Sequence, residues 1–122
     1  MAKKVLIVED ELALKKALSK KFTKEKFEVM TASNGKTGLA SAFKDHPDII
    51  LLDLIMPVMD GLTMLKELRK DKWGHEVIVI ILTNLSEAEK TAEALEQGVH
   101  DYLIKTDWSL EDISKKVKEK LA

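Results

Sequence analysis

The strongest constraint on the fold of this 122-residue chain is an alternation, repeated five times, of a short apolar run with a helical pattern. The first run, residues 5–8, is continuous and rich in β-branched side chains, as is typical of a strand covered on both faces. Leu14, Ala17, Leu18 and Phe22 then recur at helical spacing. Strands that alternate with helices in this way predict βαβ units, with right-handed crossovers between parallel strands.

Four further units follow the first one along the chain. Strands are expected at 28–32, 49–53, 77–82 and 102–104, and the first of these is the weakest, as suits a sheet edge. Helix starts are indicated by turn or capping patterns, which are Asn34-Gly35, Asp60-Gly61, Ser86 with Glu89, and Ser109 with Asp112. The apolar stripes of these helices are expected in the core, including the stripe of the fourth helix, which is formed by Ala88, Ala92, Leu95 and Val99.

These elements predict an α/β fold with a single doubly wound (βα)5 domain over residues 1–122. The expected sheet has five parallel strands in the order 2-1-3-4-5, a flavodoxin-like topology. Neither a linker nor a low-complexity segment is visible in the sequence. In such a sheet the carboxyl ends of the strands form the crevice where ligands bind, so the residues that follow each strand are the candidates for function.

Composition narrows the function classes. Acidic and basic residues nearly cancel, 21 against 20, so nothing global indicates binding to nucleic acid or to an anionic membrane. The absence of cysteine excludes disulfides, thiolate metal sites and cysteine catalysis in this chain. The longest apolar run, residues 77–82, is far too short to span a membrane, and the N-terminus carries no signal-peptide pattern. A soluble cytoplasmic protein is therefore expected.

Acidic side chains gather at the expected crevice. Glu9 and Asp10 end the first strand and Asp53 ends the third, and these two strands are neighbours in the predicted order. Three close carboxylates repel one another, which raises the pKa of at least one of them unless a cation intervenes. Lys105, at the end of the fifth strand, leaves a formal charge of about −2, and hard oxygen ligands suit Mg²⁺, with Mn²⁺ possible.

The same crevice offers a nucleophile for phosphoryl transfer. An ionised carboxylate such as Asp53 attacks phosphorus without a general base and forms an acyl phosphate. Cations then neutralise the phosphoryl oxygens, a role open to Mg²⁺ and Lys105. Thr83, at the end of the fourth strand, is able to donate a hydrogen bond to a phosphoryl oxygen.

Four motifs carry a resemblance to a known family. V-L-I-V-E-D (5–10), I-I-L-L-D-L-I-M-P-V-M-D-G (49–61), V-I-I-L-T-N (79–84) and D-Y-L-I-K (101–105) resemble those of the receiver domain of bacterial two-component response regulators. The similarity covers the whole chain. It implies a phosphorelay domain that accepts a phosphoryl group from a histidine kinase or a histidine phosphotransfer protein, in a Mg²⁺-dependent reaction. Catalysis would be limited to its own phosphorylation and dephosphorylation.

The resemblance also implies a role for each site residue. Asp53 would be the phosphoacceptor, and Glu9, Asp10 and Asp53 would hold the metal with the backbone carbonyl of Ile55. Thr83 and Lys105 would contact the phosphoryl group. Tyr102 matches an aromatic position that moves inward when the threonine engages phosphate. The partner-binding surface would change at the helix after Thr83, the fifth strand and the last helix, for a downstream protein that the sequence does not identify.

Two positions, Thr106 and Asn84, depart from the family pattern. Thr106 follows Lys105 where proline is usual, which leaves the peptide bond either trans or strained, because a non-proline cis bond costs about 2.5–4 kcal/mol. Asp107 adds an acid near Lys105. Asn84 stands where small residues are usual and is expected to crowd the mouth of the site. Ile55 and Leu85 are both apolar, and we hypothesise that they shield the acyl phosphate from water.

Other interpretations remain open at this point. Taken alone, Asp10 could cap the first helix, Thr83 could simply end a strand, Lys105 could be solvated and Tyr102 could pack as a half-buried ring. A flavin protein would need a phosphate-cradling loop after the first strand, where this chain has Glu9-Asp10-Glu11. A hydrolase with an aspartyl-phosphate intermediate commonly carries a second acid at the position of Ile55. A degenerate receiver would bind partners without phosphorylation.

Overall fold

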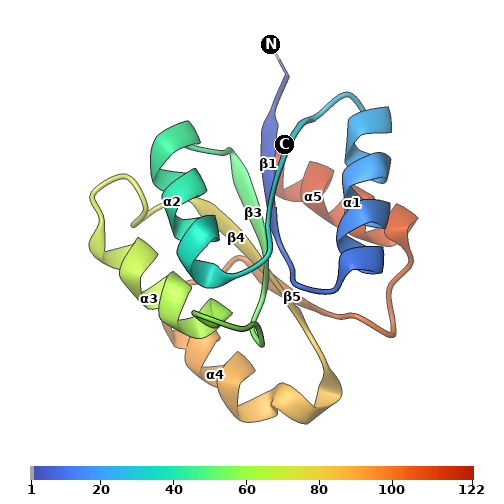
Figure 1. Ribbon diagram of the computed structural model, residues 1–122. Coiled ribbons are helices and arrows are strands. Elements are labelled where there is room, and N and C mark those ends of the chain that lie inside the picture. The colour runs from blue at the N-terminus through green and yellow to red at the C-terminus, as the bar shows by residue number, and fades with distance from the viewer. Residues whose placement is uncertain (1) are drawn as a thin grey trace.

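The computed structural model describes residues 2–122, apart from the side chain of Leu85, and shows five parallel strands and five α-helices (Figure 1). The strands are β1 (Lys4–Val8), β2 (Glu28–Ala32), β3 (Ile49–Asp53), β4 (Ile78–Thr83) and β5 (Asp101–Ile104). The helices are α1 (Leu12–Lys24), α2 (Gly35–Asp45), α3 (Gly61–Lys70), α4 (Ala88–Glu96) and α5 (Leu110–Leu121), and a short 3₁₀ helix, Leu85–Glu87, precedes α4. The strand order is β2-β1-β3-β4-β5, as predicted.

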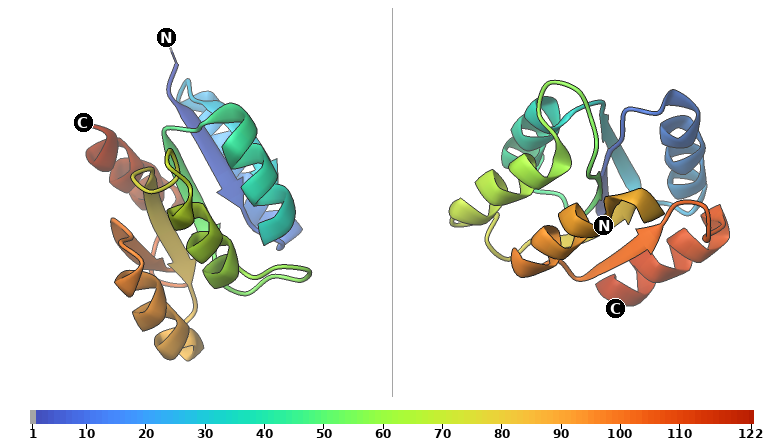
Figure 2. Two further views of the ribbon diagram at one scale, coloured as in Figure 1. Left: turned by 90° about the vertical axis from the view of Figure 1, so that its left-hand side faces the viewer. Right: turned by 90° about the horizontal axis from the view of Figure 1, so that it is seen from below.

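The sheet separates two apolar cores. Helices α1 and α5 cover one face, and α2, α3 and α4 cover the other (Figures 1 and 2). Successive residues of a strand point to opposite faces, so Ile50 and Leu52 belong to one core while Ile49 and Leu51 belong to the other. Burial on both faces is the reason why β3 reads as an unbroken apolar run.

The strand register places the expected site at one edge of the sheet. Val8 pairs with Leu52 across β1 and β3, and Asp53 pairs with Leu82 across β3 and β4. Thr83, the last residue of β4, pairs with Ile104 at the end of β5. The residues that follow β1, β3 and β5 are therefore brought to a common edge, which lies at the lower end of the sheet in Figure 1.

A tight loop between β3 and α3 forms one side of this edge. The Gly61 amide donates a hydrogen bond to the carbonyl of Leu54 at 2.9 Å, and a Cβ at Gly61 would lie 2.0 Å from the Asp53 carbonyl oxygen. Only glycine permits this approach. Within the loop, Val58 has a φ of +68°. The residues on either side of it are hydrogen-bonded to each other, since the Met59 amide donates to the Pro57 carbonyl at 2.8 Å. A β-branched residue is strained in that conformation.

Two expectations for α4 were wrong. Ser86 does not cap it: the helix begins at Ala88 with Glu87 as an N-cap residue that makes no side-chain capping bond. The reason is the preceding 3₁₀ turn, in which the Glu87 amide is already bonded to the carbonyl of Asn84. The predicted stripe is not core either, because Ala88, Ala92 and Leu95 are exposed, and only the residue beyond the helix, Val99, packs against the core.

The buried residues of α4 are Thr91 and Ala94. Since α4 sits near the edge of the sheet beside β5, a narrow contact face suffices, and two small residues let the helix approach closely. The apolar stripe is thereby turned toward solvent next to Tyr102. Helix α5 follows the prediction, with Ser109 and Asp112 forming a complete capping box.

The three histidines lie at exposed positions: His46 is the C-cap residue of α2 in a left-handed conformation, and His75 and His100 lie in connecting segments. Within residues 2–122, no helix is long and apolar enough to cross a membrane.

Candidate functional site

Three carboxylates meet where β1 and β3 end. Glu9 and Asp10 directly follow β1, and Asp53 is the last residue of its neighbour β3. One carboxylate oxygen from each lies within 4.8 Å of the others. Glu9 is fully buried and Asp53 is 4% exposed, whereas Asp10 is open to solvent. The parallel register alone creates this cluster, because it aligns the carboxyl ends of adjacent strands.

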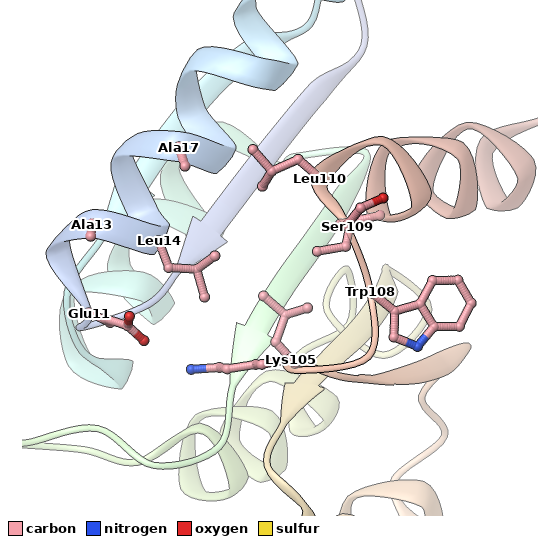
Figure 3. A pocket seen from close by; sticks show the side chains of 10 residues that line it. Glu11, Ala13, Leu14, Ala17, Lys105, Trp108, Ser109 and Leu110 are labelled. Carbon is pink, nitrogen blue, oxygen red and sulfur yellow. The ribbon is translucent and has the colours of Figure 1, made fainter.

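Lys105 supplies the positive charge of the site. Its amide donates to the carbonyl of Thr83 at 2.8 Å, which extends the β4–β5 pairing by one residue. Its Nζ lies 2.5 Å from Glu9 Oε1 and 3.2 Å from Asp53 Oδ2. Figure 3 shows the side chain extending toward the first turn of α1, away from the Trp108 ring. The solvated interpretation of Lys105 is therefore wrong.

An apolar hollow of about 440 Å³ lies beside this lysine, between α1 and α5 (Figure 3). Its lining includes Leu14, Ala17 and Leu110. Lys105 also lines this hollow, while its Nζ contacts Glu9 and Asp53, so the hollow adjoins the acidic site.

Burial and charge perturb the ionisable groups. Burial, followed by the neighbouring Glu9 carboxyl, raises the pKa of Asp53 to about 7, although Lys105 acts in the opposite direction. Burial lowers the pKa of Lys105, but Glu9 and Asp53 together outweigh it, so the pKa is raised above its ordinary value. Two acids thus share one ammonium group.

This donor set fits a divalent metal ion. Three acids and one lysine carry a formal charge of −2, so the contacts of the Lys105 ammonium with Glu9 and Asp53 leave the negative charge of the site uncompensated. Buried negative charge in excess of its positive partners is costly unless a further cation compensates it. Hard oxygen donors at this spacing suit Mg²⁺, which takes one or two carboxylates together with water and a phosphate oxygen.

Thr83 and Tyr102 stand apart from the acids. The Thr83 hydroxyl lies 3.1 Å from the hydroxyl of Thr91 on α4 and 3.3 Å from the carbonyl of Asn84. Tyr102 is 43% exposed, and a hollow of about 300 Å³ is lined by Thr83, Thr91, Tyr102 and the exposed stripe of α4. The sequence predicted both residues for the site, but the structure places their side chains on the α4 side of β4.

The Lys105–Thr106 bond is trans, since no cis peptide bond occurs in residues 2–122. Asp107 lies in the following turn, where its carboxylate accepts from the Thr106 hydroxyl at 3.5 Å, and its amide donates to the carbonyl of Ile104. The one departure from the family pattern that touches Lys105 is thus accommodated without a cis bond.

Asp10 does not cap α1. The N-cap residue is Glu11, which makes no side-chain capping bond, and the Glu11 amide instead donates to Glu9 Oε2 at 3.2 Å. The capping interpretation of Asp10 is therefore wrong, and its carboxylate remains available to a ligand.

Three residues, Ile55, Asn84 and Leu85, were expected to crowd or shield the opening of the acidic site. Ile55 is exposed, and its amide donates to Asp53 Oδ1 at 3.4 Å. Asn84 is exposed too, while its backbone carbonyl accepts from the Glu87 amide. The second shielding residue of our hypothesis, Leu85, has a side chain outside the described part of the chain.

Two residues that sequence reasoning missed connect this region to the rest of the fold. Thr91 is buried under the hydroxyl of Thr83, and the signal for it was a single hydroxyl in an otherwise alanine-rich helix face. Arg69 lies near the end of α3, and its guanidinium donates hydrogen bonds to four backbone carbonyls. Two belong to the segment between α3 and β4 and two to the segment between α4 and β5: Gly74, Val77, Gln97 and Gly98.

Comparisons with known proteins agree with this geometry. Residues 5–118 match the family described as the response regulator receiver domain. The chain is 41% identical over 105 residues to the response regulator PleD of Caulobacter vibrioides and 42% identical over 104 residues to the regulatory protein AtoC of Escherichia coli. These matches cover 86% and 84% of this chain but only 23% and 22% of the relatives' length.

Solved structures show the same fold over nearly all of the described chain. The chemotaxis response regulator CheY4 of Vibrio cholerae superposes with a TM-score of 0.89 at 29% identity, covering 98% of each chain. A response regulator from Chloroflexus aurantiacus superposes with a TM-score of 0.90 at 26% identity, covering 99% of this chain and 98% of the other.

Proposed function

Because this chain belongs to the family of response regulator receiver domains, we propose that its 122 residues act as one phosphoacceptor domain with Asp53 as the acceptor. A histidine kinase or a histidine phosphotransfer protein is the expected donor. The observation that carries this proposal is the placement of a buried carboxylate between two further acids and one lysine, at adjacent strand ends.

The chemistry follows from the position of Asp53. An ionised Oδ of Asp53 attacks phosphorus while the bond from phosphorus to the donor's imidazole nitrogen breaks, so the donor histidine leaves with that electron pair. Lys105, 3.2 Å from the carboxylate, is placed to neutralise charge on the phosphoryl oxygens. No general base is needed, because the nucleophile carries no proton when it reacts.

Glu9, Asp10 and Asp53 are the residues that would hold Mg²⁺. The family resemblance adds the backbone carbonyl of Ile55 as a further ligand. When bound, the ion supplies positive charge to the phosphoryl oxygens and lowers the pKa of the nucleophile. Mn²⁺ is an alternative occupant of the same ligands. We predict that the protein is cytoplasmic and that this chain binds neither nucleic acid nor membrane.

The output of phosphorylation is proposed to be a change of surface. Thr83 turns its hydroxyl from α4 toward the phosphoryl group, and Tyr102 moves from its exposed position into the hollow beside Thr83. Such a local charge event biases a two-state element. The surface that changes includes the exposed apolar stripe of α4 and the neighbouring β5, and its partner is a protein not yet identified.

The test is phosphorylation by a small donor. The protein is incubated with acetyl phosphate and Mg²⁺, its intact mass is measured, and the measurement is repeated without Mg²⁺ and with Asp53→Ala. The expected result is one phosphoryl adduct that requires the metal and is absent in the variant. An adduct of equal size in Asp53→Ala would exclude Asp53 as the acceptor.

The same assay tests the shielding hypothesis. Replacing Ile55 by asparagine, and Leu85 by glutamate, is expected to shorten the lifetime of the acyl phosphate, because polar side chains at the mouth admit and orient water. A lifetime equal to or longer than that of the unchanged protein would refute the shielding role.

A further inference from the structure

A chain of two buried hydroxyl groups links the end of β4 to α4. Thr83 Oγ1 lies 3.1 Å from Thr91 Oγ1, and Thr91 Oγ1 donates to the carbonyl of Glu87 at 2.9 Å. Both side chains are buried, with Thr91 only 8% exposed. A hydroxyl group has a single proton to donate. With the Thr91 proton given to Glu87, the Thr83 hydroxyl is left to donate either to Thr91 or to the carbonyl of Asn84.

The proton of Thr83 therefore has competing acceptors. In the resting structure two acceptors lie within its reach, Thr91 Oγ1 at 3.1 Å and the Asn84 carbonyl at 3.3 Å, and Thr91 is the nearer. Engaging a phosphoryl oxygen on Asp53 requires the same proton. Each acceptor excludes the other, so the strength of the bond to Thr91 sets how readily Thr83 turns toward the site.

We propose that Thr91 is a positioning residue that holds Thr83 in its resting orientation and so opposes activation. This inference rests on the proposed function, because it concerns the hydroxyl that is to contact the phosphoryl group. Among residues 2–122, the hydrogen-bond partners of the Thr91 hydroxyl are Thr83 and Glu87, which are neither the phosphoacceptor nor the metal ligands. Thr91 acts only through Thr83, and its effect must vanish when Thr83 has no hydroxyl.

The arrangement also explains how α4 would sense the change. The C-terminal end of α4 is tied down, because Arg69 donates to the carbonyls of Gln97 and Gly98 just beyond the helix. Toward its beginning, the side-chain link from β4 is the bond between Thr83 and Thr91. Withdrawal of the Thr83 hydroxyl removes this link, and the first turn of α4 is then the end that is free to shift.

A purely structural role for Thr91 makes a different prediction. Threonine in a helix commonly bonds back to the carbonyl four residues earlier, and Thr91 does so with Glu87. If that were its whole function, removing the hydroxyl would alter stability and leave the affinity for a phosphoryl mimic unchanged.

The experiment is a titration with beryllofluoride and Mg²⁺, which together mimic the acyl phosphate. Tyr102 is the only tyrosine, so its ring resonances report the switch without overlap. Thr91→Val removes the hydroxyl at constant shape, Thr91→Ser retains it, and Thr91→Ala serves as a second deletion should the valine variant fold poorly. Thermal unfolding without ligand establishes that each variant is folded.

We expect Thr91→Val to bind beryllofluoride about threefold to tenfold more tightly than the unchanged protein, the equivalent of one neutral hydrogen bond. Thr91→Ser should bind as the unchanged protein does. In a Thr83→Val background, Thr91→Val should have no effect, as a double-mutant cycle requires for residues that act through each other.

Unchanged or weaker binding by a folded Thr91→Val protein would overturn the inference, as would an equal effect in the Thr83→Val background. Failure of the proposed function itself looks different: the unchanged protein would show no beryllofluoride-dependent shift of Tyr102, and neither would the Asp53→Asn protein.

Discussion

Replacing Asp53 by asparagine is expected to stabilise the metal-free protein at pH 8. In the folded chain Asp53 is buried beside Glu9, and one lysine is shared between the two acids. The pKa of Asp53 is therefore about 7 rather than the usual 3.8. An amide at this position removes the repulsion from Glu9, while Lys105 keeps its closer contact with Glu9 at 2.5 Å.

The magnitude follows from linkage between protonation and folding. A carboxyl whose pKa is raised in the folded state binds its proton more tightly there, so stability falls as the pH rises from about 4 to about 7. A difference of about 3 pKa units corresponds to about 4 kcal/mol. Because the neighbouring Asp10 is exposed and solvent screens charge at this edge of the site, we halve this figure and expect Asp53→Asn to gain about 2 kcal/mol at pH 8.

Urea unfolding in the presence of EDTA measures this gain. The unchanged protein and Asp53→Asn are compared between pH 4.5 and pH 8, with Asp107→Asn as a control that removes an exposed aspartate from the β5–α5 turn. The advantage of Asp53→Asn should shrink steadily as the pH falls below 7. A variant that is no more stable than the unchanged protein at pH 8, or whose advantage is independent of pH, refutes the reasoning.

Magnesium should reduce the stability advantage of Asp53→Asn over the unchanged protein. A ligand that binds only the folded state stabilises it in proportion to the logarithm of its concentration over Kd, and Asp53→Asn has lost one carboxylate ligand. The unchanged protein should therefore gain more free energy of unfolding on addition of Mg²⁺ than the variant does.

Three further substitutions test the surrounding structure by urea unfolding. Arg69→Met should lower the free energy of unfolding by about 2–4 kcal/mol, because four carbonyls lose a charged donor and only some of them regain water; a loss below 1 kcal/mol would show that the guanidinium is dispensable. Val58→Asn should raise the free energy of unfolding by about 1 kcal/mol, because valine is strained at a φ of +68° whereas asparagine tolerates the left-handed region. The side chain is 79% exposed, so little packing is lost. A decrease would mean that the turn is not strained. Gly61→Ala should cost about 1–3 kcal/mol because its Cβ would meet the Asp53 carbonyl at 2.0 Å, and an unchanged midpoint would show that the loop can yield.

The acidic half of the site was predictable because it depends on strand ends alone. Glu9, Asp10, Asp53 and Lys105 each follow an apolar run, and parallel pairing brings such positions together whatever the details of side-chain packing. The prediction for α4 failed for the opposite reason. The stripe of α4 has correct helical spacing, but spacing alone does not decide which face of the helix packs on the sheet. Here the small residues Thr91 and Ala94 form a second possible contact face, and that face is the buried one.

The sequence by itself determined which chemical groups are present and at which ends of which strands they stand, because periodicity and turn residues are local properties of the chain. It also determined the strand order, once a doubly wound parallel sheet was inferred. Only the tertiary structure decided which acceptors surround the Thr83 hydroxyl, that Tyr102 faces solvent, and that two acids share one lysine. Those outcomes depend on side chains that are distant in sequence and compete within a few ångströms, and no local pattern records the result of that competition.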